Sequence, residues 1–452
     1  MENGLIHPNH YGFLKKCSTA HALQHIVDLW LQSIDKNKIN AALLLDLSAG
    51  FDVINLDLLL HKLRLYNFDE TTMHWFESYL KGRQQCVQIE SAFSPLIPVQ
   101  WGVPQGSILG PILFLLFINE LPHIVKNDNP DTEPNDVAAN TTEESHIIVF
   151  ADDNTPTCSE THPEDLLNKI EDDAKTVTDW FAKNDMICSA DKTKLILITS
   201  KANRASKLTG PARGISVNGE YKEETESEKL LGLVINNSCT WKNHLHGDAE
   251  NQGLLKQLSQ RVGILRRLKK YLPSPKFQQI VNGIYFSKQI YCLTVFGSLW
   301  GLPGSMDEDN RNSIMLTKED MRKMQVLQNS VMRITTNSRY DTPTSELLSK
   351  SNQLSVHQLT AYHTACQVFN IRRNQFPPYH MQRLFGEQNS LRSGTSLESR
   401  VEFKSSLGRG SFFYYGSRLW NFLPHSAKTA PDIKMFKRMV KPWIKSHISI
   451  KP

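Results

Sequence analysis

An apolar run that ends in two adjacent acids constrains this chain more than any other feature. Residues 147–150, directly after His146, are Ile-Ile-Val-Phe and predict a β-strand, and Ala151, Asp152 and Asp153 follow at once. Side chains alternate along a strand, so neighbouring acids share a site only when a tight turn between two strands presents them. The sequence therefore predicts a β-hairpin that carries carboxylates at its tip.

A second predicted strand also ends in a carboxylate. Residues 41–45 are all Ala or Leu, Asp46 closes the run, and Phe51 follows five residues later. Carboxylates from two strands can hold two Mg²⁺ ions, with Mn²⁺ as a substitute, as in polymerases and nucleases. An Asp-Asp pair alone is more often a solvated turn. Because a second strand supplies a third carboxylate, we favour a metal site of the kind that nucleic-acid polymerases use.

The overall composition narrows the class of protein. The 452 residues predict about three domains, and 51 basic against 46 acidic side chains give a net charge of +5, compatible with a polyanionic partner. The seven cysteines show no zinc spacing, and no signal peptide or membrane-spanning run is evident. We therefore expect a soluble, intracellular chain of the cytoplasm or nucleus, without a membrane partner. Basic charge concentrates at Lys256, Arg261, Arg266, Arg267, Lys269 and Lys270.

The apolar periodicity predicts an irregular mixture of elements. Helices are expected near 18–35, 57–66, 70–80, 111–121 and 163–184, strands at 40–48, 194–199 and 229–235, and hairpins at 84–99 and around 217–220. Residues 123–145 read as a surface loop and 385–400 as a linker, and helices dominate after about residue 245, ending in a basic helix near 431–447. This order favours an α+β fold with an antiparallel sheet flanked by helices.

Three segments together resemble the palm motifs of reverse transcriptases, most closely those of LINE-type (non-LTR) retrotransposons of the Jockey and chicken-repeat kind. They are residues 44–52, 101–111 and 150–153, and the resemblance continues at 180–184, 192–194, 231–241 and 416–424, so it covers nearly the whole chain. It implies a right-hand polymerase palm with partial fingers. Expected regions are residual fingers at 1–40, the palm with inserted fingers elements at 41–244, a helical thumb at 245–350 and a C-terminal helical and aromatic region at 351–452.

The resemblance also implies a role for each matching residue. The activity would be RNA-directed DNA polymerisation, with an RNA template, a DNA primer and deoxynucleoside triphosphates as partners. Asp46, Asp152 and Asp153 match the metal-binding carboxylates. Other matching positions are Leu47 (a backbone carbonyl near the metal), Phe51 (under the nucleotide sugar), Gln105 and Gly106 (the nucleotide and template pocket), Lys192 with Lys194 as runner-up (protonation of pyrophosphate) and Gly232 (primer grip). The basic residues from Lys256 to Lys270 would contact nucleic acid as part of the thumb.

Two departures from the family pattern leave alternatives open. Leu14 stands where the family usually has an arginine, so Lys15 or Lys16 would have to contact the triphosphate as point charges. The endonuclease that such elements usually encode upstream is missing, so we expect an N-terminally truncated element. The alternatives are a relic that binds RNA or RNA–DNA duplex without polymerising, and an interaction protein that keeps the palm as a scaffold.

Overall fold

The computed structural model describes residues 5–47, 49–125, 145–189, 191–296, 317–386, 401–405 and 407–450. Most of the predicted loop at 123–145 and linker at 385–400 lie outside these residues. The chain divides into two compact units, and each is built from separate stretches of sequence. Unit 1 comprises Met1–Ala22, Asn40–Leu197 and Thr209–Thr225, and unit 2 comprises Leu23–Ile39, Ile198–Leu208 and Glu226–Pro452.

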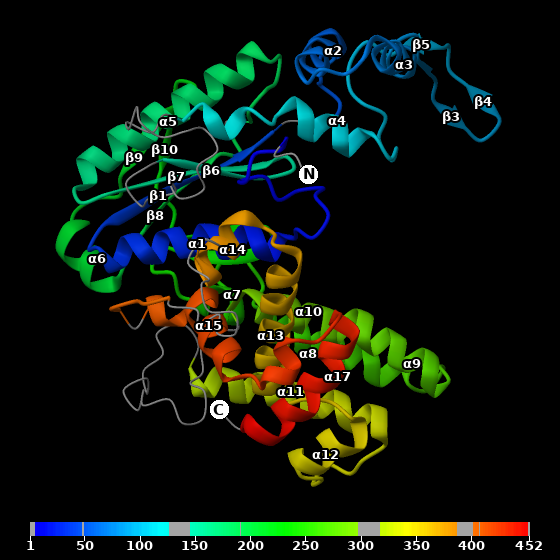
Figure 1. Cartoon of the computed structure of the whole chain (residues 1–452), viewed down its shortest axis with the longest axis vertical. Coiled ribbons are helices and arrows are strands. Elements are labelled where there is room, and N and C mark those ends of the chain that lie inside the picture. Colours follow the sequence, from blue (N-terminus) through cyan, green and yellow to red (C-terminus); the bar gives the residue numbers. More distant parts are fainter. Residues whose placement is uncertain are drawn as a thin grey trace. The chain divides into compact units, whose positions relative to one another are not determined.

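A four-stranded sheet forms the centre of unit 1. Its strands lie in the order β6-β7-β1-β8, and Figure 1 labels them side by side. Their bounds are β1 (Ile39–Asp46), β6 (His146–Phe150), β7 (Asp153–Glu160) and β8 (Lys194–Ile198). Strands β6 and β7 are antiparallel, and their apolar side chains are buried together with those of β1. The predicted mixture of helices with a sheet is confirmed, and three of these strands had been expected near these positions.

Unit 1 also contains helices near the positions that the periodicity predicted. They are α2 (Leu56–Leu65), α3 (Glu70–Leu80), α4 (Gly110–Phe117) and α5 (Pro163–Lys183), and α5 packs against β7. Side-chain oxygens of Asn55 and Asp69 accept backbone N–H groups at the starts of α2 and α3, which fixes where these helices begin. A 3₁₀ turn, η1 (Leu121–His123), follows α4.

A buried lysine joins three of these helices. The Lys62 ammonium on α2 donates a hydrogen bond to the Phe117 carbonyl at 3.0 Å and forms an ion pair with Glu120. It also lies 4.7 Å and 4.8 Å from the ring centroids of Phe117 and Trp180, so α2, α4 and α5 meet around one charge. Burial lowers the pKa of Lys62, while Glu120 opposes that change.

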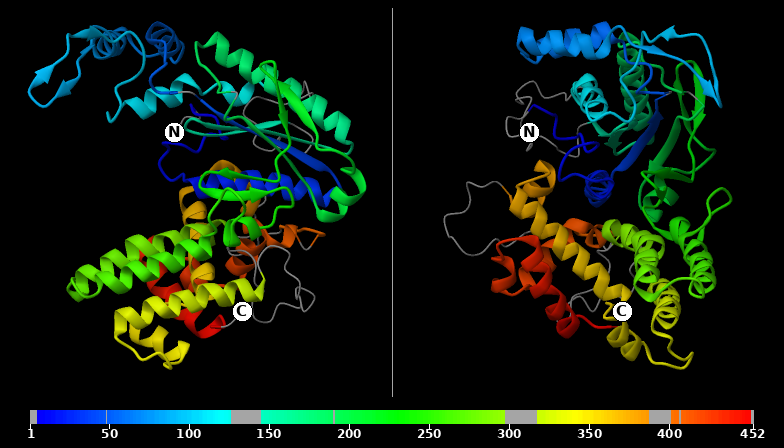
Figure 2. Two further views of the ribbon diagram at one scale, coloured as in Figure 1. Left: turned by 180° about the vertical axis from the view of Figure 1, so that it is seen from behind. Right: turned by 90° about the vertical axis from the view of Figure 1, so that its right-hand side faces the viewer.

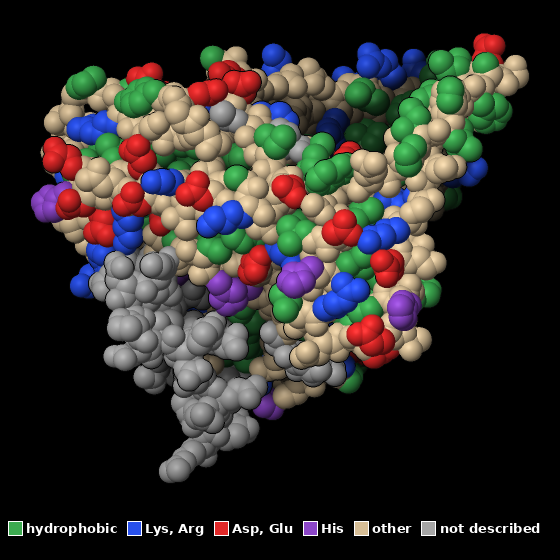
Figure 3. Space-filling model, turned by 90° about the horizontal axis from the view of Figure 1, so that it is seen from above, with side chains coloured by type: hydrophobic (Ala, Val, Ile, Leu, Met, Phe, Trp, Pro, Cys, Tyr) green, Lys and Arg blue, Asp and Glu red, His purple; other side chains and the backbone are tan. Residues whose placement is uncertain are grey.

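Two small ribbons extend the unit beyond α3. Strands β2 (Gln84–Gln85) and β5 (Ile97–Pro98) pair, as do β3 (Gln88–Ile89) and β4 (Ala92–Phe93), which confirms the hairpin expected at 84–99. Figure 2 shows the ribbons projecting from the rest of the unit, and Figure 3 shows hydrophobic side chains gathered on this arm. Its most exposed apolar side chains are Val87, Ile89, Phe93, Leu96 and Ile97.

The remaining strands form two further hairpins, one of which corrects the sequence analysis. Strands β9 (Gly214–Val217) and β10 (Glu220–Glu223) turn at Asn218-Gly219, as predicted. The single strand expected at 229–235 is wrong. It is a hairpin of β11 (Ser227–Leu230) and β12 (Leu233–Asn236), because Leu231 and Gly232 take φ of 46° and 84° and reverse the chain within an apolar run.

Unit 2 is mainly helical. Its helices in the described part of the chain are α1 (Thr19–Asp35, whose first turn belongs to unit 1), α6 (Lys201–Lys207), α7 (Lys242–His246), α8 (Leu254–Leu268), α9 (Ser274–Val281), the π-helix η3 (Asn282–Phe286), α10 (Ser287–Phe296), α11 (Lys318–Thr336), α12 (Thr344–Ser351), α13 (Val356–Asn374), α14 (Pro378–Phe385), η6 (Gly408–Gly410), α15 (Phe412–Phe422), α16 (His425–Lys428) and α17 (Ile433–His447). Helix α13 is buried around most of its circumference because it packs against α10, α14, α15 and α17.

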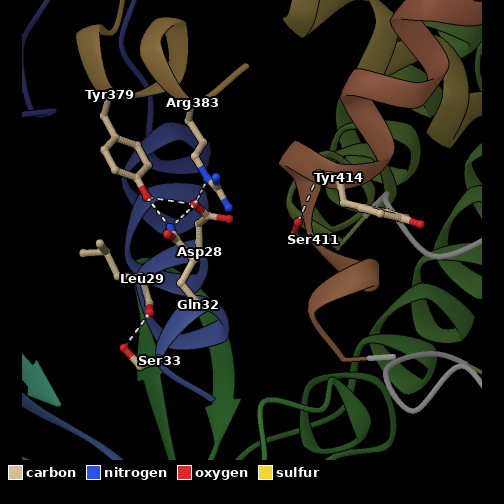
Figure 4. A network of polar contacts seen from close by, with 8 residues as sticks. All are labelled: Asp28, Leu29, Gln32, Ser33, Tyr379, Arg383, Ser411 and Tyr414. Atoms are coloured by element: carbon tan, nitrogen blue, oxygen red, sulfur yellow. Dashed lines mark hydrogen bonds and ion pairs between the residues drawn. The ribbon is translucent and has the colours of Figure 1, made fainter. Parts of the chain in front are cut away.

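A buried carboxylate anchors α14 to α1. One oxygen of Asp28, a residue only 1% exposed, accepts hydrogen bonds from Gln32 at 2.7 Å, the Tyr379 hydroxyl at 2.8 Å and the Arg383 guanidinium at 2.9 Å (Figure 4). The His25 ring stacks on the Tyr379 ring with centroids 3.5 Å apart. This network therefore joins residues more than 350 positions apart within unit 2.

Among the described residues, no helix has both the length and the apolar character needed to cross a bilayer.

Candidate active site

The predicted hairpin tip is present in unit 1. Phe150 pairs with Asp153, so Ala151 and Asp152 alone form the turn between β6 and β7. Ala151 takes a φ of 58°, which such a two-residue turn requires at its first position. The Asn154 side chain donates to the Asp152 carbonyl at 2.8 Å and stabilises the turn from within. The two neighbouring acids therefore stand where the chain reverses.

The N-terminal segment directly before Leu14 supports this turn, a contact that the sequence analysis did not predict. The Tyr11 amide donates to the Val149 carbonyl at 2.9 Å, and the Val149 amide donates to the Asn9 carbonyl at 3.0 Å. Gly12 then lies so close to the turn that a Cβ there would stand 2.4 Å from the Ala151 nitrogen. Only glycine permits this approach. The glycine itself, next to Phe13, was the one sign in the sequence of a close backbone contact.

Asp46 stands at the end of β1, beside a lysine from a distant part of the chain. The Ser189 amide donates to the Asp46 carbonyl at 3.1 Å, which brings the segment before β8 to this strand end. The Lys192 ammonium lies 3.0 Å from an Asp46 carboxylate oxygen, with both side chains partly exposed. Asp46 and Lys192, which were proposed for one site from the sequence, are thus in direct contact.

The three predicted carboxylates share one electrostatic environment. Desolvation, together with the negative charges of Asp152 and Asp46, raises the pKa of Asp153 to about 6. The Asp153 residue is solvent-exposed, so it is accessible to a ligand from solution. Among the described residues, however, no group of three or more acidic, histidine or cysteine side chains is arranged as a metal-ligand set.

Phe51 packs in an aromatic stack beside this strand end. Its ring stacks on Phe114 of α4 with centroids 4.4 Å apart and 21° between planes, and Phe13 meets its edge at 5.7 Å. Neither Phe13 nor Phe114 was predicted, because their contact with Phe51 depends on how α4 and the N-terminal segment pack. Phe51 is half-buried, and these two ring contacts fix the position of its exposed apolar surface.

The Gln105-Gly106 segment is held beside Phe51 by local contacts. The Val103 amide donates to the Phe51 carbonyl at 3.0 Å, and the Gln105 side chain donates to an Asp52 carboxylate oxygen at 2.7 Å. Asp52 thus serves as the hydrogen-bond acceptor that holds the Gln105 side chain. Gly106, with a φ of 76°, has open space where a side chain would stand.

The other candidate residues fall into two groups. In unit 1, Lys15 and Lys16 are exposed in a turn, Leu14 is buried at 8%, and Leu47 is buried in an antiparallel bridge to Cys188. In unit 2, Gly232 forms the β11–β12 turn. Of the basic residues, Arg261 donates to the Ile284 carbonyl, Lys269 lies over the Phe277 ring, and the exposed ones are Lys256, Arg266, Arg267 and Lys270. Their roles toward nucleotide or nucleic acid stay predictions.

Curated relatives of this chain come from mobile elements. One is the RNA-directed DNA polymerase from mobile element jockey of Drosophila funebris, 23% identical over 235 residues, 52% of this chain and 24% of that protein. Another is the probable RNA-directed DNA polymerase from transposon BS of Drosophila melanogaster, 23% identical over 372 residues, 81% of this chain and 37% of that protein. The chain thus spans well under half the length of these relatives. They confirm the resemblance to elements of the Jockey kind.

A solved structure of telomerase from Candida tropicalis with a TWJ fragment of telomeric RNA aligns at 13% identity and a TM-score of 0.38, over 79% of this chain and 51% of that one. That score is too low to support a conclusion by itself. The family model for reverse transcriptase (RNA-dependent DNA polymerase) matches residues 1–235, which include every candidate residue of the site in unit 1. Since this match covers more than half of the 452 residues, the chain belongs to the reverse transcriptase family.

Proposed function

We propose that this chain is the reverse transcriptase of a non-LTR retrotransposon and extends a DNA primer on an RNA template. The observation that carries the proposal is the placement of Asp152 and Asp153 at the β6–β7 turn, where burial and the charges of Asp152 and Asp46 raise the pKa of Asp153. A fold has no structural reason to gather three acids at a cost in repulsion unless cations balance them. In this proposal the sheet β6-β7-β1-β8 is the palm, the 84–99 ribbons belong to the fingers, and unit 2 supplies the thumb and C-terminal region.

The donor set fits a hard divalent cation. Carboxylate oxygens are the ligands that Mg²⁺ prefers, and Asp46, Asp152 and Asp153 would hold it. When bound, such ions neutralise charge on the phosphates during nucleotidyl transfer. As placed here the three side chains are not a completed ligand set, and Lys192 lies against one oxygen of Asp46. The side chains therefore have to rearrange for a cation to enter.

The neighbouring residues receive roles from their contacts. Lys192 is an ammonium next to the acidic cluster, suited to donate a proton to the leaving pyrophosphate. Phe51, braced by Phe114, provides the surface under the sugar, and the Asp52 hydrogen bond fixes Gln105 at the edge of the pocket. Lys15 and Lys16, exposed in the turn that follows Phe13, are the candidates for contact with the triphosphate.

Primer extension tests the proposal. The purified chain, given an RNA template with an annealed DNA primer, deoxynucleoside triphosphates and Mg²⁺, is expected to lengthen the primer. The double variant Asp152→Asn/Asp153→Asn is expected to give no product, whereas Asp165→Asn/Asp172→Asn, which neutralises two exposed acids of α5, is expected to match the wild type. Equal product from the wild type and the Asp152→Asn/Asp153→Asn variant would refute the assigned site.

A second candidate function is binding of RNA or RNA–DNA duplex without polymerisation. It is favoured by Leu14, which is buried and cannot take the place of a triphosphate-binding arginine. Under this alternative the wild type binds template–primer in a salt-dependent manner but adds no nucleotide with either Mg²⁺ or Mn²⁺.

A further inference from the structure

Helix α17, near the C-terminus, is amphipathic, and its apolar side is already occupied. Phe436, Val440 and Ile444 are fully buried, and the helix packs against α13 in unit 2. The Phe436 ring stacks on Phe369 of α13, with centroids 4.3 Å apart and 21° between planes. The side of α17 that remains available to a partner is therefore its polar side.

The polar side of α17 carries a continuous row of cations. The row consists of Lys434, Lys437, Arg438, Lys441 and Lys445, which we call the α17 stripe. Lys437 and Arg438 are neighbours, and each stripe residue lies three or four positions from another, so the five lie along one side of the helix. The helix contains no Asp or Glu between Ile433 and His447, and within the described part of the chain no carboxylate forms an ion pair with the stripe.

The contacts of the stripe within the fold leave its charge uncompensated. Lys441 and Lys445 both donate to Asn352, one to its backbone carbonyl and one to its side-chain oxygen, each at 3.0 Å, and both acceptors are neutral. Burial and the nearby charge of Lys445 lower the pKa of Lys441. Burial and Lys437 lower the pKa of His363 on α13 to about 4. The cations of the stripe therefore repel one another, and Lys437 disfavours a positive charge on His363.

Two other surface helices of unit 2, α11 and α12, pair cations with acids on the same helix. On α11, Arg322 pairs with Glu319 at 2.7 Å, and on α12, Lys350 pairs with Glu346 at 2.7 Å. A solvated helix face usually mixes both signs in this way, because opposite charges three or four residues apart stabilise the helix. The α17 stripe departs from that pattern, which points to a negatively charged partner outside the fold.

We propose that the α17 stripe binds the phosphodiester backbone of a nucleic acid. From Lys434 to Lys445 the helix rises about 16 Å at 1.5 Å per residue. One strand of a duplex places a phosphate about every 3.4 Å along its axis, so about five phosphates match the five cations over the same length. A membrane surface fits less well, because an amphipathic helix binds lipid through its apolar side and that side of α17 is buried against α13.

Salt-dependent binding to the full chain tests the proposal without requiring catalysis. Fluorescein-labelled 20-base-pair RNA duplex and DNA duplex serve as probes, and the logarithm of the binding constant is plotted against the logarithm of salt concentration. The test variant is Lys434→Ala/Lys437→Ala/Arg438→Ala, since these three side chains are exposed. The matched control removes three cations of the same unit that have acidic partners, Arg322→Ala/Arg339→Ala/Lys350→Ala.

The test variant is expected to reduce the slope of that plot by about 2 to 3 and to weaken binding on the order of 100-fold at 0.1 M salt. The control is expected to leave the slope and the affinity unchanged. The charge-conserving variant Lys434→Arg/Lys437→Arg/Arg438→Lys is expected to keep both at wild-type values. A larger effect on one duplex identifies whether RNA or DNA is the partner.

Unchanged affinity and slope in the test variant, with circular dichroism showing an intact fold, would overturn the proposal. So would stripe-dependent binding to phosphatidylserine vesicles without an effect on either duplex. Because binding is read without nucleotides, failure of primer extension would leave this result standing, and failure here would leave the polymerase assay standing.

Discussion

The charge on Asp153 opposes folding at neutral pH. Its pKa is about 6 in the folded chain against an ordinary value of 3.8, so between these values the folded chain binds more protons than the unfolded chain. The free energy of unfolding therefore falls as pH rises through this interval. We expect Asp153→Asn to raise the thermal midpoint by about 1–2 °C at pH 7.5 and to leave it unchanged near pH 4.

Thermal denaturation followed by circular dichroism at both pH values measures this difference, and Asp172→Asn on the exposed side of α5 is the control. Added Mg²⁺ should stabilise the wild type more than Asp153→Asn, because the cation would balance the charge that the variant lacks. An equal gain from Mg²⁺ in both proteins would argue against a cation at this turn.

Lys192 is expected to matter for activity and hardly at all for stability. Its ion pair with Asp46 is largely exposed, so Lys192→Gln should change the free energy of unfolding by less than about 0.5 kcal/mol. As a proton donor to the leaving group, the lysine should contribute about 10²- to 10⁴-fold to the rate of nucleotide addition. Single-turnover incorporation kinetics measure that rate. Lys194→Gln is the comparison, and a loss confined to that variant would transfer the role to Lys194.

At the scale of single residues, the sequence predicted the acids of the site better than their surroundings. Asp46 and Asp153 stand at strand ends and Asp152 in the turn between them, because apolar runs that stop at an acid mark where a strand ends. Gly12 and Phe114 were missed, since their contacts with Ala151 and Phe51 join segments far apart in the chain. No local pattern encodes such contacts.

Among the elements, the N-terminal segment and the β6–β7 turn depend on one close approach. A methyl group at position 12 would collide with the Ala151 backbone, so Gly12→Ala should destabilise unit 1 by about 1–3 kcal/mol and lower primer extension by displacing Asp152 and Asp153. Urea denaturation and primer extension measure the two effects. Gly263→Ala, in open space within α8, should instead stabilise the chain by about 0.5–1 kcal/mol. Wild-type behaviour of Gly12→Ala would contradict the packing described.

The same N-terminal segment is expected to make the fold sensitive to acid. Burial, together with neighbouring histidines, lowers the pKa of His7 and of His10 to about 3, and the His7 ring meets His123 edge-on at 4.3 Å. Unfolded histidines bind protons near pH 6.5, so this contribution is complete above that pH and declines as pH falls toward 3. The urea midpoint should therefore drop between pH 7 and pH 5, and His10→Leu should flatten the drop. An equally steep profile in His10→Leu would assign the acid sensitivity to other groups.

Most helices and hairpins followed from periodicity and turn residues. The β9–β10 turn was predictable because Asn218-Gly219 suits a two-residue hairpin. The β11–β12 hairpin was not, because Leu231 at a positive φ gives no sequence signal and its apolar neighbours continue the strand pattern. Helix α8 buries Leu254, Leu258, Val262 and Leu265, and packing within unit 2 determines which side of the helix faces inward.

Across the whole molecule, the Asp28 network is the expected anchor of the C-terminal helices in unit 2. Asp28→Ala would leave Arg383 and Tyr379 without their shared acceptor, so the free energy of unfolding should fall by about 3–5 kcal/mol. Guanidinium denaturation measures this loss. Glu346→Ala, which breaks an exposed ion pair of α12, should cost no more than about 1 kcal/mol. Similar losses in the two variants would mean that the buried network adds nothing beyond a surface pair.

The division into units was the least predictable feature. Composition and family resemblance suggested regions that follow one another along the chain, and those boundaries stay predictions. Each compact unit is instead built from separate stretches of the chain. The first turn of α1 belongs to unit 1, whereas its Asp28 binds partners near residue 380 in unit 2. Contacts between residues so far apart in sequence depend on how the folded helices pack. Local sequence patterns do not encode that packing.

This interleaving has a consequence for synthesis on the ribosome. Helix α1 emerges early, but Tyr379 and Arg383 follow roughly 350 residues later, which corresponds to about 20–70 s of translation. Throughout that interval the apolar side of α1 and the Asp28 carboxylate lack their partners on α14. The nascent chain thus offers chaperones an early, long-lived target, and a pause in elongation before residue 379 would prolong the time in which it can aggregate.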